Sequence, residues 1–326
     1  MDSESLELFA EATRALVADA HKPVGWSLLR EFGWLDLMAE RPQTAAPLLL
    51  EELGRRGRAS AAVDVCVSAA VRAAGADLPD APASYVFAGA CASERIVNGQ
   101  VPVTGVLLWQ EPGEELWILV PVVDGIERAL AVARLAPGTS VSMPAGVDAR
   151  SHAVVVTTGP AEVVHLLDGG SADRAEQAAR RAVGHELVGL TAGMLAIAVE
   201  HATARMQFGR TIGSFQAVKH MLADVVVAME AARGALDECW QGPAEAELVS
   251  LVATVLCGRA AELAIRNCLQ VTGGMGFTEE FPLGALVRRA LMIEPLFGGE
   301  RASTSQVGRT LFSAKQVPRL SDFKES

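Results

Sequence analysis

One long apolar seam in the second half of the chain most strongly constrains how it can fold. In the stretch SFQAVKHMLADVVVAMEAARGAL, apolar side chains recur at alternating spacings of three and four residues over three heptads. This spacing is typical of a helix that packs lengthwise against its neighbours in a bundle. The seam consists of Phe215, Val218, Leu222, Val225, Met229, Ala232 and Leu236.

The rhythm of the apolar residues divides the chain into three regions. Residues 1–77 are predicted to be helical, because their apolar positions follow helical spacing. Residues 78–168 contain short β-rich runs separated by Gly, Pro and Asp turns, which predict a small β domain. Residues 169–326 are helical again and include a second long helix that begins after Pro243 and ends near Gln270. The predicted fold class is mainly α with a small β domain.

Charge and composition limit the partners that this chain can have. A net charge of −11 argues against nucleic acid as the main partner, because phosphate backbones are bound by basic surfaces. The five cysteines are widely spaced without a Cys-x-x-Cys pair, which indicates reduced thiols. The segment MDSESLELF is acidic where a secretory signal would be basic, and the most apolar run, Leu248 to Cys257, is too short to span a bilayer. We therefore expect a cytoplasmic protein that does not insert into a membrane.

The segment RMQFGRTIGSFQ, which starts at Arg205, has the composition of a polyanion site. Arg205 and Arg210 fall at the junction of two predicted helices, where two glycines let the backbone turn. The planar fork of arginine suits a pyrophosphate, and free N–H groups at a helix start near Ser214 favour negative charge. Phe208 would add an aromatic face. The alternative is a capped turn between helices with two solvated arginines.

A second motif, QVTGGMGFTEEFP, occupies residues 270–282. Its glycine cluster at a helix end permits close approach of the backbone to a ligand, and Gln270 can hydrogen-bond a nucleotide. Considered alone, such a glycine cluster is more often a helix C-cap followed by a loop.

Taken together, the two motifs resemble the acyl-CoA dehydrogenase family. The pattern R-x-Q-F-G-R-x-I-x-x-F-Q is followed about sixty residues later by Q-x-x-G-G-x-G-F-T-E-E-x-P, and the resemblance is strong from Glu186 to Gly299. It is weaker near the start, where LREFGWLDL and LLEELGRRG resemble the first helices of that family. The resemblance implies N-terminal helices, a middle β-barrel-like domain and a C-terminal four-helix bundle, in a flavoprotein that dimerises and usually forms tetramers.

The resemblance also implies a cofactor, a reaction and a set of binding residues. Members of the family use FAD to introduce a double bond between the α and β carbons of an acyl-CoA thioester, and pass the electrons to an electron-transfer acceptor. The motif residues hold the ADP half of FAD across a subunit interface. In this chain they are Arg205, Gln207, Phe208, Gln216, Gln270, Gly273 and Gly274.

The catalytic base is where the chain departs from the family. The family removes the α proton with a glutamate, because only a positioned, ionised group can take so weakly acidic a proton. The two positions that supply this glutamate hold Phe297 and Ala179 here. Glu300 lies one turn beyond Phe297 and is the candidate for a relocated base, and Glu186, two turns beyond Ala179, is a second one. The alternative is that both are helix-capping or solvated carboxylates.

The region expected to contact the reactive half of FAD is also reduced. The stretch YVFAGACASERIVNGQ (residues 85–100) lacks the T-E-P-x-x-G-S-D type loop that contacts the flavin ring and the substrate in the family, and the N-terminal region is shortened. A chain that keeps only the residues serving its neighbour's cofactor should pair with a complete subunit. We therefore predict an accessory subunit that assembles with a full-length acyl-CoA dehydrogenase as α2β2. Short chains of this kind resemble those of actinobacterial dehydrogenases that act on steroid-derived CoA thioesters.

Two other functions remain open at the level of sequence. One is a self-sufficient, homo-oligomeric acyl-CoA dehydrogenase that uses Glu300 or another relocated base. The other is a structural scaffold without a cofactor, against which the retained motif residues argue, because a scaffold has no chemical use for that combination. No metal site is predicted, since no second histidine follows His185 at the spacing of a metal-binding helix.

Overall fold

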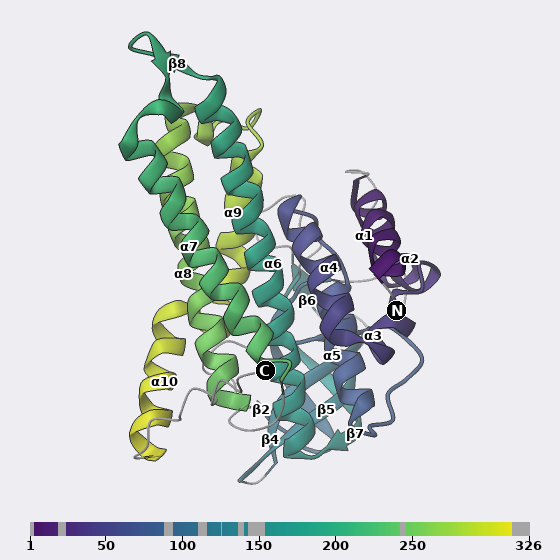
Figure 1. The fold of residues 1–326 in the computed structure, drawn as a ribbon. Helices are drawn as coiled ribbons and strands as arrows, with labels where there is room; N and C mark the ends of the chain where they lie inside the picture. Colours follow the sequence, from purple (N-terminus) through teal and green to yellow (C-terminus); the bar gives the residue numbers. More distant parts are fainter. Residues whose placement is uncertain are drawn as a thin grey trace, which may run out of the picture.

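The computed structural model describes residues 3–18, 24–87, 94–109, 116–124, 126–135, 140–142, 154–241 and 246–314. Figure 1 shows a group of N-terminal helices on one side, a sheet below them, and a tall helical bundle that rises beside both. The order of helices, sheet and helices is the predicted one, so the fold class is confirmed.

Five helices form the N-terminal region within the described residues. They are α1 (Ser3–Ala18), α2 (Trp26–Glu31), α3 (Trp34–Glu40), α4 (Pro42–Arg55) and α5 (Ala62–Ala73). Helix α4 begins with a proline, whose missing N–H is not needed in the first turn, and it ends just before Gly57, which has a φ of +61°. On α5, the buried carboxylate of Asp64 accepts the backbone N–H of Tyr85 at 2.9 Å. This hydrogen bond ties the helices to the sheet.

A seven-stranded sheet occupies the middle of the chain. Its strands are β1 (Ala83–Tyr85), β2 (Glu94–Arg95), β3 (Gln100–Leu107), β4 (Trp117–Asp124), β5 (Glu127–Leu135), β6 (Ser140–Ser142) and β7 (Val154–Leu167). The strand order is β1-β4-β5-β7-β3, with β2 also paired to β4 and β6 to β7. The two pairs that β1 and β2 make with β4 are parallel and the others are antiparallel.

Successive residues of the central strands face two different cores. On β4, Ile118 and Val120 lie in a small core of the sheet itself, whereas Leu119 lies in the large core shared with the helices. On β5, Leu130 and Val132 belong to the large core in the same way. Because side chains alternate across a strand, both faces are apolar, and these strands read as nearly continuous apolar runs.

The C-terminal region is a bundle built around one long central helix. Its helices are α6 (Gly169–Ala204), α7 (Gln216–Glu238), α8 (Ala246–Thr272), α9 (Leu283–Ile293) and α10 (Gly299–Ala314). The short connections are the strands β8 (Met206–Gln207) and β9 (Arg210–Thr211) and the 3-10 turns η2 (Ile212–Ser214), η3 (Gly273–Phe277) and η4 (Glu294–Phe297). Helix α6 packs against α4, α5, α7, α8 and α9.

The predicted seam on α7 lies along the bundle, with one end less covered than the other. Its C-terminal half, from Val225 to Leu236, is buried, whereas Phe215, Val218 and Leu222 near its start are only half-buried. The seam therefore packs within the bundle, and its uncovered end marks a surface that a single chain leaves open.

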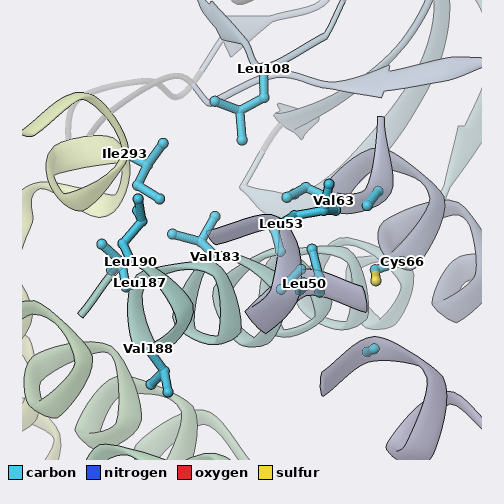
Figure 2. Close-up of a cluster of buried hydrophobic side chains, with 14 of the residues drawn as sticks. Leu50, Leu53, Val63, Cys66, Leu108, Val183, Leu187, Val188, Leu190 and Ile293 are labelled. Atoms are coloured by element: carbon cyan, nitrogen blue, oxygen red, sulfur yellow. The ribbon is translucent and has the colours of Figure 1, made fainter. Parts of the chain in front are cut away.

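Glycines let α4 and α6 cross in direct backbone contact. A Cβ at Gly189 would lie 2.2 Å from the carbonyl oxygen of Glu51, and a Cβ at Gly54 would lie 2.2 Å from that of Glu186. No other residue fits at such distances. Figure 2 shows the apolar core next to this crossing, where Leu53 of α4 lies close to Val183 of α6.

Among the described residues, two helical spans are long and apolar enough by length and composition to cross a membrane, namely α6 and α8 together with the turn η3 that follows it. The run Leu248 to Cys257 is thus part of a longer apolar helix than the sequence alone suggested, which corrects the argument from its length. In the fold, 78% of the apolar window of α6 and 50% of that of α8 are buried inside the protein. Packing within the protein accounts for most of the apolar window of α6 and for half of that of α8.

Candidate functional site

The first motif forms a small hairpin that projects beyond one end of the bundle (Figure 1). Strands β8 and β9 are joined by Phe208 and Gly209, which both have positive φ values, +52° and +76°. Two consecutive positive φ values are typical of the tight turns that match the twist of a two-residue hairpin. The backbone N–H of Ile212 donates to the carbonyl of Arg205 at 2.8 Å and closes the base of the hairpin.

The side chain of Phe208 at the tip of the hairpin is 91% exposed. A left-handed backbone costs a non-glycine residue roughly 1–2 kcal/mol, and an exposed aromatic ring recovers none of this by burial. The ring meets the edge of Phe215 at 6.2 Å, and the guanidinium of Arg210 lies 4.1 Å from the centre of the Phe215 ring. The hairpin thus presents an aromatic and cationic surface to solvent.

The two glycines of this motif have different roles. Gly209 turns the chain, as expected, but Gly213 does not have a positive φ. Instead, a Cβ at Gly213 would lie 2.9 Å from the carbonyl oxygen of Ala202, so this glycine lets the segment approach the end of α6. The expectation that both glycines turn the backbone is therefore correct for Gly209 only.

The helix that follows begins two residues later than expected and leaves its first N–H groups without a side-chain cap. Ser214 lies in η2, where its hydroxyl donates to the carbonyl of Thr211 at 2.7 Å. Helix α7 starts at Gln216, and its N-cap residue is Phe215, which supplies no capping oxygen. Uncapped N–H groups at a helix start favour an anion, and Arg205 and Arg210 lie in the segment just before them.

The second motif provides an open glycine turn at the end of α8. Gly273 has a φ of +60°, and within the described residues no atom beyond the adjacent residues lies within 4 Å of a Cβ built at Gly273 or Gly274. Gln270 is exposed one turn earlier. Gly276 is different, because a Cβ there would lie 2.3 Å from the hydroxyl of Thr272, so it serves packing.

Both motifs lie at the same end of the bundle. Helices α6 and α8 end there, and the ring of His201 near the end of α6 meets Phe281, just past the second motif, at 5.9 Å. We call the exposed residues at this end the motif surface. It consists of Arg205, Gln207, Phe208, Gln216, Gln270, Gly273 and Gly274, all of which are exposed. An arginine fork, uncapped helix N–H groups and open glycine backbone fit the ADP half of FAD.

The position that the family reserves for the base is part of an aromatic cluster between the sheet and the bundle. Phe297 meets Phe87 edge-on at 5.5 Å, and Phe87 meets Tyr85 in the same manner at 5.1 Å. The guanidinium of Arg180 lies 4.4 Å from the centre of the Phe297 ring. The other position, Ala179, is fully buried. We call Tyr85, Phe87, Phe297 and Arg180 the aromatic cluster. Residues 88–93, which belong to the altered stretch 85–100, lie outside the described residues.

Glu300 is engaged in an ion pair on the surface of α10. Its carboxylate accepts from Nε of Arg259 at 2.8 Å and from the hydroxyl of Thr304 at 3.3 Å. The hydrogen bond from Arg259 lowers the pKa of Glu300 below its ordinary value. A lowered pKa makes this carboxylate a poorer base, and its surroundings match the alternative of a solvated, helix-terminal carboxylate.

Glu186 forms a buried ion pair that joins two helices of the bundle. Its carboxylate on α6 accepts from Nε of Arg289 on α9 at 2.7 Å, and the two side chains are 2% and 1% exposed. A buried charge needs its partner, so this carboxylate stabilises the bundle. Both substitute bases suggested by the sequence therefore have structural partners in the fold.

Sequence reasoning missed a polar network that joins α4, α6 and α7. Glu51 accepts two hydrogen bonds from Arg233 at 3.0 and 3.1 Å and lies 3.3 Å from Nδ1 of His185. Trp240 donates to Nε2 of His185 at 3.4 Å, which places the histidine proton on Nδ1, facing Glu51. Burial opposes ionisation of Glu51, but His185 and Arg233 hold its pKa below the ordinary value. The partners come from distant segments, so no local signal reveals them.

Comparison with known proteins relates the C-terminal part of the chain to one family. Residues 172–312 match the family model of the acyl-CoA dehydrogenase C-terminal domain. Acyl-CoA dehydrogenase FadE34 of Mycobacterium tuberculosis is 34% identical over 154 residues, which are 45% of this chain and 21% of that protein. The 3-sulfinopropanoyl-CoA desulfinase of Paraburkholderia xenovorans is 33% identical over 139 residues, which are 41% of this chain and 35% of that protein. The matched segments thus cover only a minor part of these relatives.

Solved structures share the fold over nearly the whole chain. A Tcur3481–Tcur3483 steroid ACAD variant has a TM-score of 0.79 at 19% identity, covering 96% of this chain and 99% of that one. A chain of the ChsE4–ChsE5 complex from Mycobacterium tuberculosis has a TM-score of 0.75 at 19% identity, covering 98% and 99%. Glutaryl-CoA dehydrogenase from Mycobacterium smegmatis has a TM-score of 0.70 at 17% identity, covering 96% and 95%. Identities this low establish the fold alone.

Proposed function

We propose that the chain is a subunit of an FAD-dependent acyl-CoA dehydrogenase, because residues 172–312 match the acyl-CoA dehydrogenase C-terminal domain and the chain has the acyl-CoA dehydrogenase fold. In this proposal it is the accessory subunit, whose motif surface completes the FAD site of a full-length partner in a cytoplasmic α2β2 complex. The partner introduces the α,β double bond into an acyl-CoA thioester, derived from a steroid, and electrons pass to an electron-transfer acceptor.

The observation that carries the proposal is an asymmetry between two places in the fold. The motif surface is exposed and chemically suited to a dinucleotide, whereas the position of the base is filled by Phe297. The two nearby carboxylates, Glu300 and Glu186, are already paired with Arg259 and Arg289. Both carboxylates suggested as substitute bases are thus engaged within the described part of the chain, while the cofactor-holding surface stays open, which supports a role in serving a neighbour that supplies the base.

The motif surface explains how the chain would hold the ADP half of FAD. Arg205 can donate two parallel hydrogen bonds to a pyrophosphate, and the uncapped start of α7 adds N–H donors of the right polarity. Gly273 and Gly274 let a ligand approach the backbone, and Phe208 offers a face for stacking. When bound, FAD supplies the flavin ring that accepts hydride from the substrate. The residues of this chain only hold and orient the other half of the cofactor.

The aromatic cluster offers no group that could remove a proton from carbon. Burial raises the pKa of Tyr85 above its ordinary value, so its phenol stays protonated. Arg180 is permanently cationic and forms an ion pair with Glu176 at 2.7 Å. Two phenylalanines complete the cluster. This local chemistry supports a non-catalytic role for this half of the complex.

The comparisons support a heteromeric partner and a steroid-derived substrate. Two of the solved structures that share the fold are described as a steroid ACAD with two named components and as a complex of ChsE4 with ChsE5. We carry the two-component assembly and the substrate class to this chain as part of the proposal. In this proposal the accessory subunit holds no flavin ring of its own, which would leave room for a bulky polycyclic acyl group.

The proposal is tested by purifying the chain alone and together with a full-length acyl-CoA dehydrogenase encoded beside it. We expect the chain alone to be colourless and inactive, and the complex to show a flavin absorbance band and acyl-CoA dehydrogenase activity. Stoichiometric flavin and turnover in the chain alone would contradict the accessory role. A complex without a flavin band would favour a scaffold instead.

The Glu300→Gln variant separates the accessory subunit from a self-sufficient enzyme. We expect turnover of the complex to change less than twofold, because Glu300 is an ion-paired surface carboxylate. A loss of several orders of magnitude would identify Glu300 as the base. Glu262→Gln, on the neighbouring helix α8, is the matched control.

A further inference from the structure

A cavity of about 170 Å³ lies between the N-terminal helices and the central helix α6. Its floor is formed by buried residues, among them Cys66 of α5 and Ala182 of α6, and exposed Ala39 and Ala73 lie at its rim. Seven of the twelve lining residues are alanine, so the walls are largely apolar. The one charged residue that lines the cavity among the described residues is Arg181.

The guanidinium of Arg181 has no counter-charge within the part of the chain that the structure describes. Its Nε is buried without a hydrogen-bond partner, and the ionisable groups close to it are the thiols of Cys239 and Cys66. Burial raises the pKa of the Cys66 thiol to about 12, so that thiol is neutral at physiological pH. The Arg181 side chain is half-buried and its guanidinium cannot lose its proton, so a carboxylate partner would compensate a charge that water reaches only in part.

Trp240 fixes the position of this charge. The Arg181 guanidinium lies 4.6 Å from the centre of the Trp240 ring, which is a cation–π contact. Trp240 is itself held by the hydrogen bond that its Nε1 donates to His185. The guanidinium of Arg181 is therefore held against a fixed ring. Ligand binding would then cost less side-chain entropy, because this side chain is already ordered.

The cavity is separate from the position of the catalytic base. At 3.6 residues per helical turn, Ala178, Arg181 and Ala182 lie on one stripe of α6, and Ala179 lies about 100° around the helix from Ala178. In Figure 2, Cys66 lies on the far side of Leu53 from Ile293 and Leu187. The region around Ile293 and Leu187 is filled by packed apolar side chains. The cavity thus belongs to another face of the helix layer.

We propose that this cavity binds a small monocarboxylate whose compact apolar body lies among the alanines and whose carboxylate pairs with Arg181. Arginine binds a carboxylate with two parallel hydrogen bonds, which supplies the missing counter-charge. The size follows from the volume, because an engineered cavity of about 150 Å³ in another protein takes up benzene. A body of about six carbons fits a cavity of this volume, so hexanoate and benzoate are the probes. This inference does not depend on the accessory role.

The test is calorimetric titration of the purified full chain with hexanoate and benzoate, and with the neutral analogues 1-hexanol and benzyl alcohol. We expect saturable binding of the acids and at least tenfold weaker binding of the alcohols. Arg181→Met should weaken acid binding at least tenfold, whereas Arg174→Met, an exposed arginine on the same helix, should leave it unchanged. If the chain purifies only with its partner, the same variants are titrated in the complex.

A second variant covers the case in which Arg181→Met fails to fold. Ala70→Leu places a larger side chain in the cavity from the half-buried edge of α5 and should abolish binding of both acids. The control is Ala231→Leu at an exposed position of α7. No binding of either acid, equal affinity for acids and alcohols, or undiminished binding in Ala70→Leu would each overturn the proposal.

Discussion

The buried carboxylate of Asp64 makes the stability of this protein depend on pH in a direction opposite to that of most aspartates. Asp64 lies at the contact between α5 and β1, where burial raises its pKa from an ordinary value of 3.8 to about 7, although the N–H of Tyr85 stabilises the charged form. Replacing it by asparagine keeps an oxygen that accepts from Tyr85 and removes the titration. We expect Asp64→Asn to be more stable than the wild type at pH 8.

The magnitude follows from the distance between the two pKa values. A group whose pKa is raised in the folded state contributes its full stability below pH 3.8 and loses it as the pH rises toward 7. At 1.36 kcal/mol for each pH unit, the total loss is about 4 kcal/mol, of which about 3 kcal/mol falls between pH 5 and pH 8. The advantage of Asp64→Asn over the wild type should grow by that amount across this interval and stay constant above it.

The assay is urea unfolding of both proteins at pH 5, 6, 7 and 8, followed by circular dichroism. Asp224→Asn, which changes an exposed aspartate of α7, is the control and should track the wild type at every pH. Parallel pH profiles for Asp64→Asn and the wild type would refute the argument, because they would mean that Asp64 titrates alike in the folded and unfolded chain.

Three further predictions concern packing and the motif surface. Gly189→Ala should lower the free energy of unfolding by several kcal/mol, because the added carbon would lie 2.2 Å from a carbonyl oxygen of α4. Gly234→Ala, at a position with open space around it, should raise the free energy of unfolding by up to about 1 kcal/mol. Urea unfolding of both variants measures this contrast. Glu186→Gln should cost about 3–5 kcal/mol in the same assay, because it leaves the charge of Arg289 buried without a partner, and a loss under 1 kcal/mol would show that the pair is dispensable. Phe208→Gly should stabilise the isolated chain by up to about 1 kcal/mol, because glycine adopts the positive φ without strain. The same variant should lower the flavin content of the complex, measured by absorbance. An unchanged flavin content would show that Phe208 does not contact the cofactor.

The arrangement of the elements is readable from the sequence because the apolar periods are long and regular. The seam of α7 predicts which side of the helix is buried from Val225 to Leu236. Its first residues are only half-buried, since periodicity shows that a face is apolar but not which chain covers it. The sequence does not predict the hairpin at Phe208, because local backbone preference disfavours a positive φ for an aromatic residue.

The candidate site is predictable only where its chemistry is local in sequence. The first motif carries its arginines, glutamines and glycines within a dozen residues and the second its glutamine and glycines, so both can be found in the sequence, and the family resemblance then implies their role. The roles of Glu300 and Glu186 depend on Arg259 and Arg289, which come from other helices. Helical spacing placed these carboxylates near the expected base position, but it could not reveal that arginines already bind them.

The most direct test of the central claim is the flavin content of the complex when only this chain is altered. The account predicts half as many flavins as chains in the wild-type complex with a full-length dehydrogenase. It predicts that Arg205→Met in this chain lowers flavin retention at least tenfold, while Arg309→Met, an exposed arginine of α10, has no effect. Full flavin retention and turnover in the Arg205→Met complex would contradict it, because the partner would then hold its cofactor without this subunit.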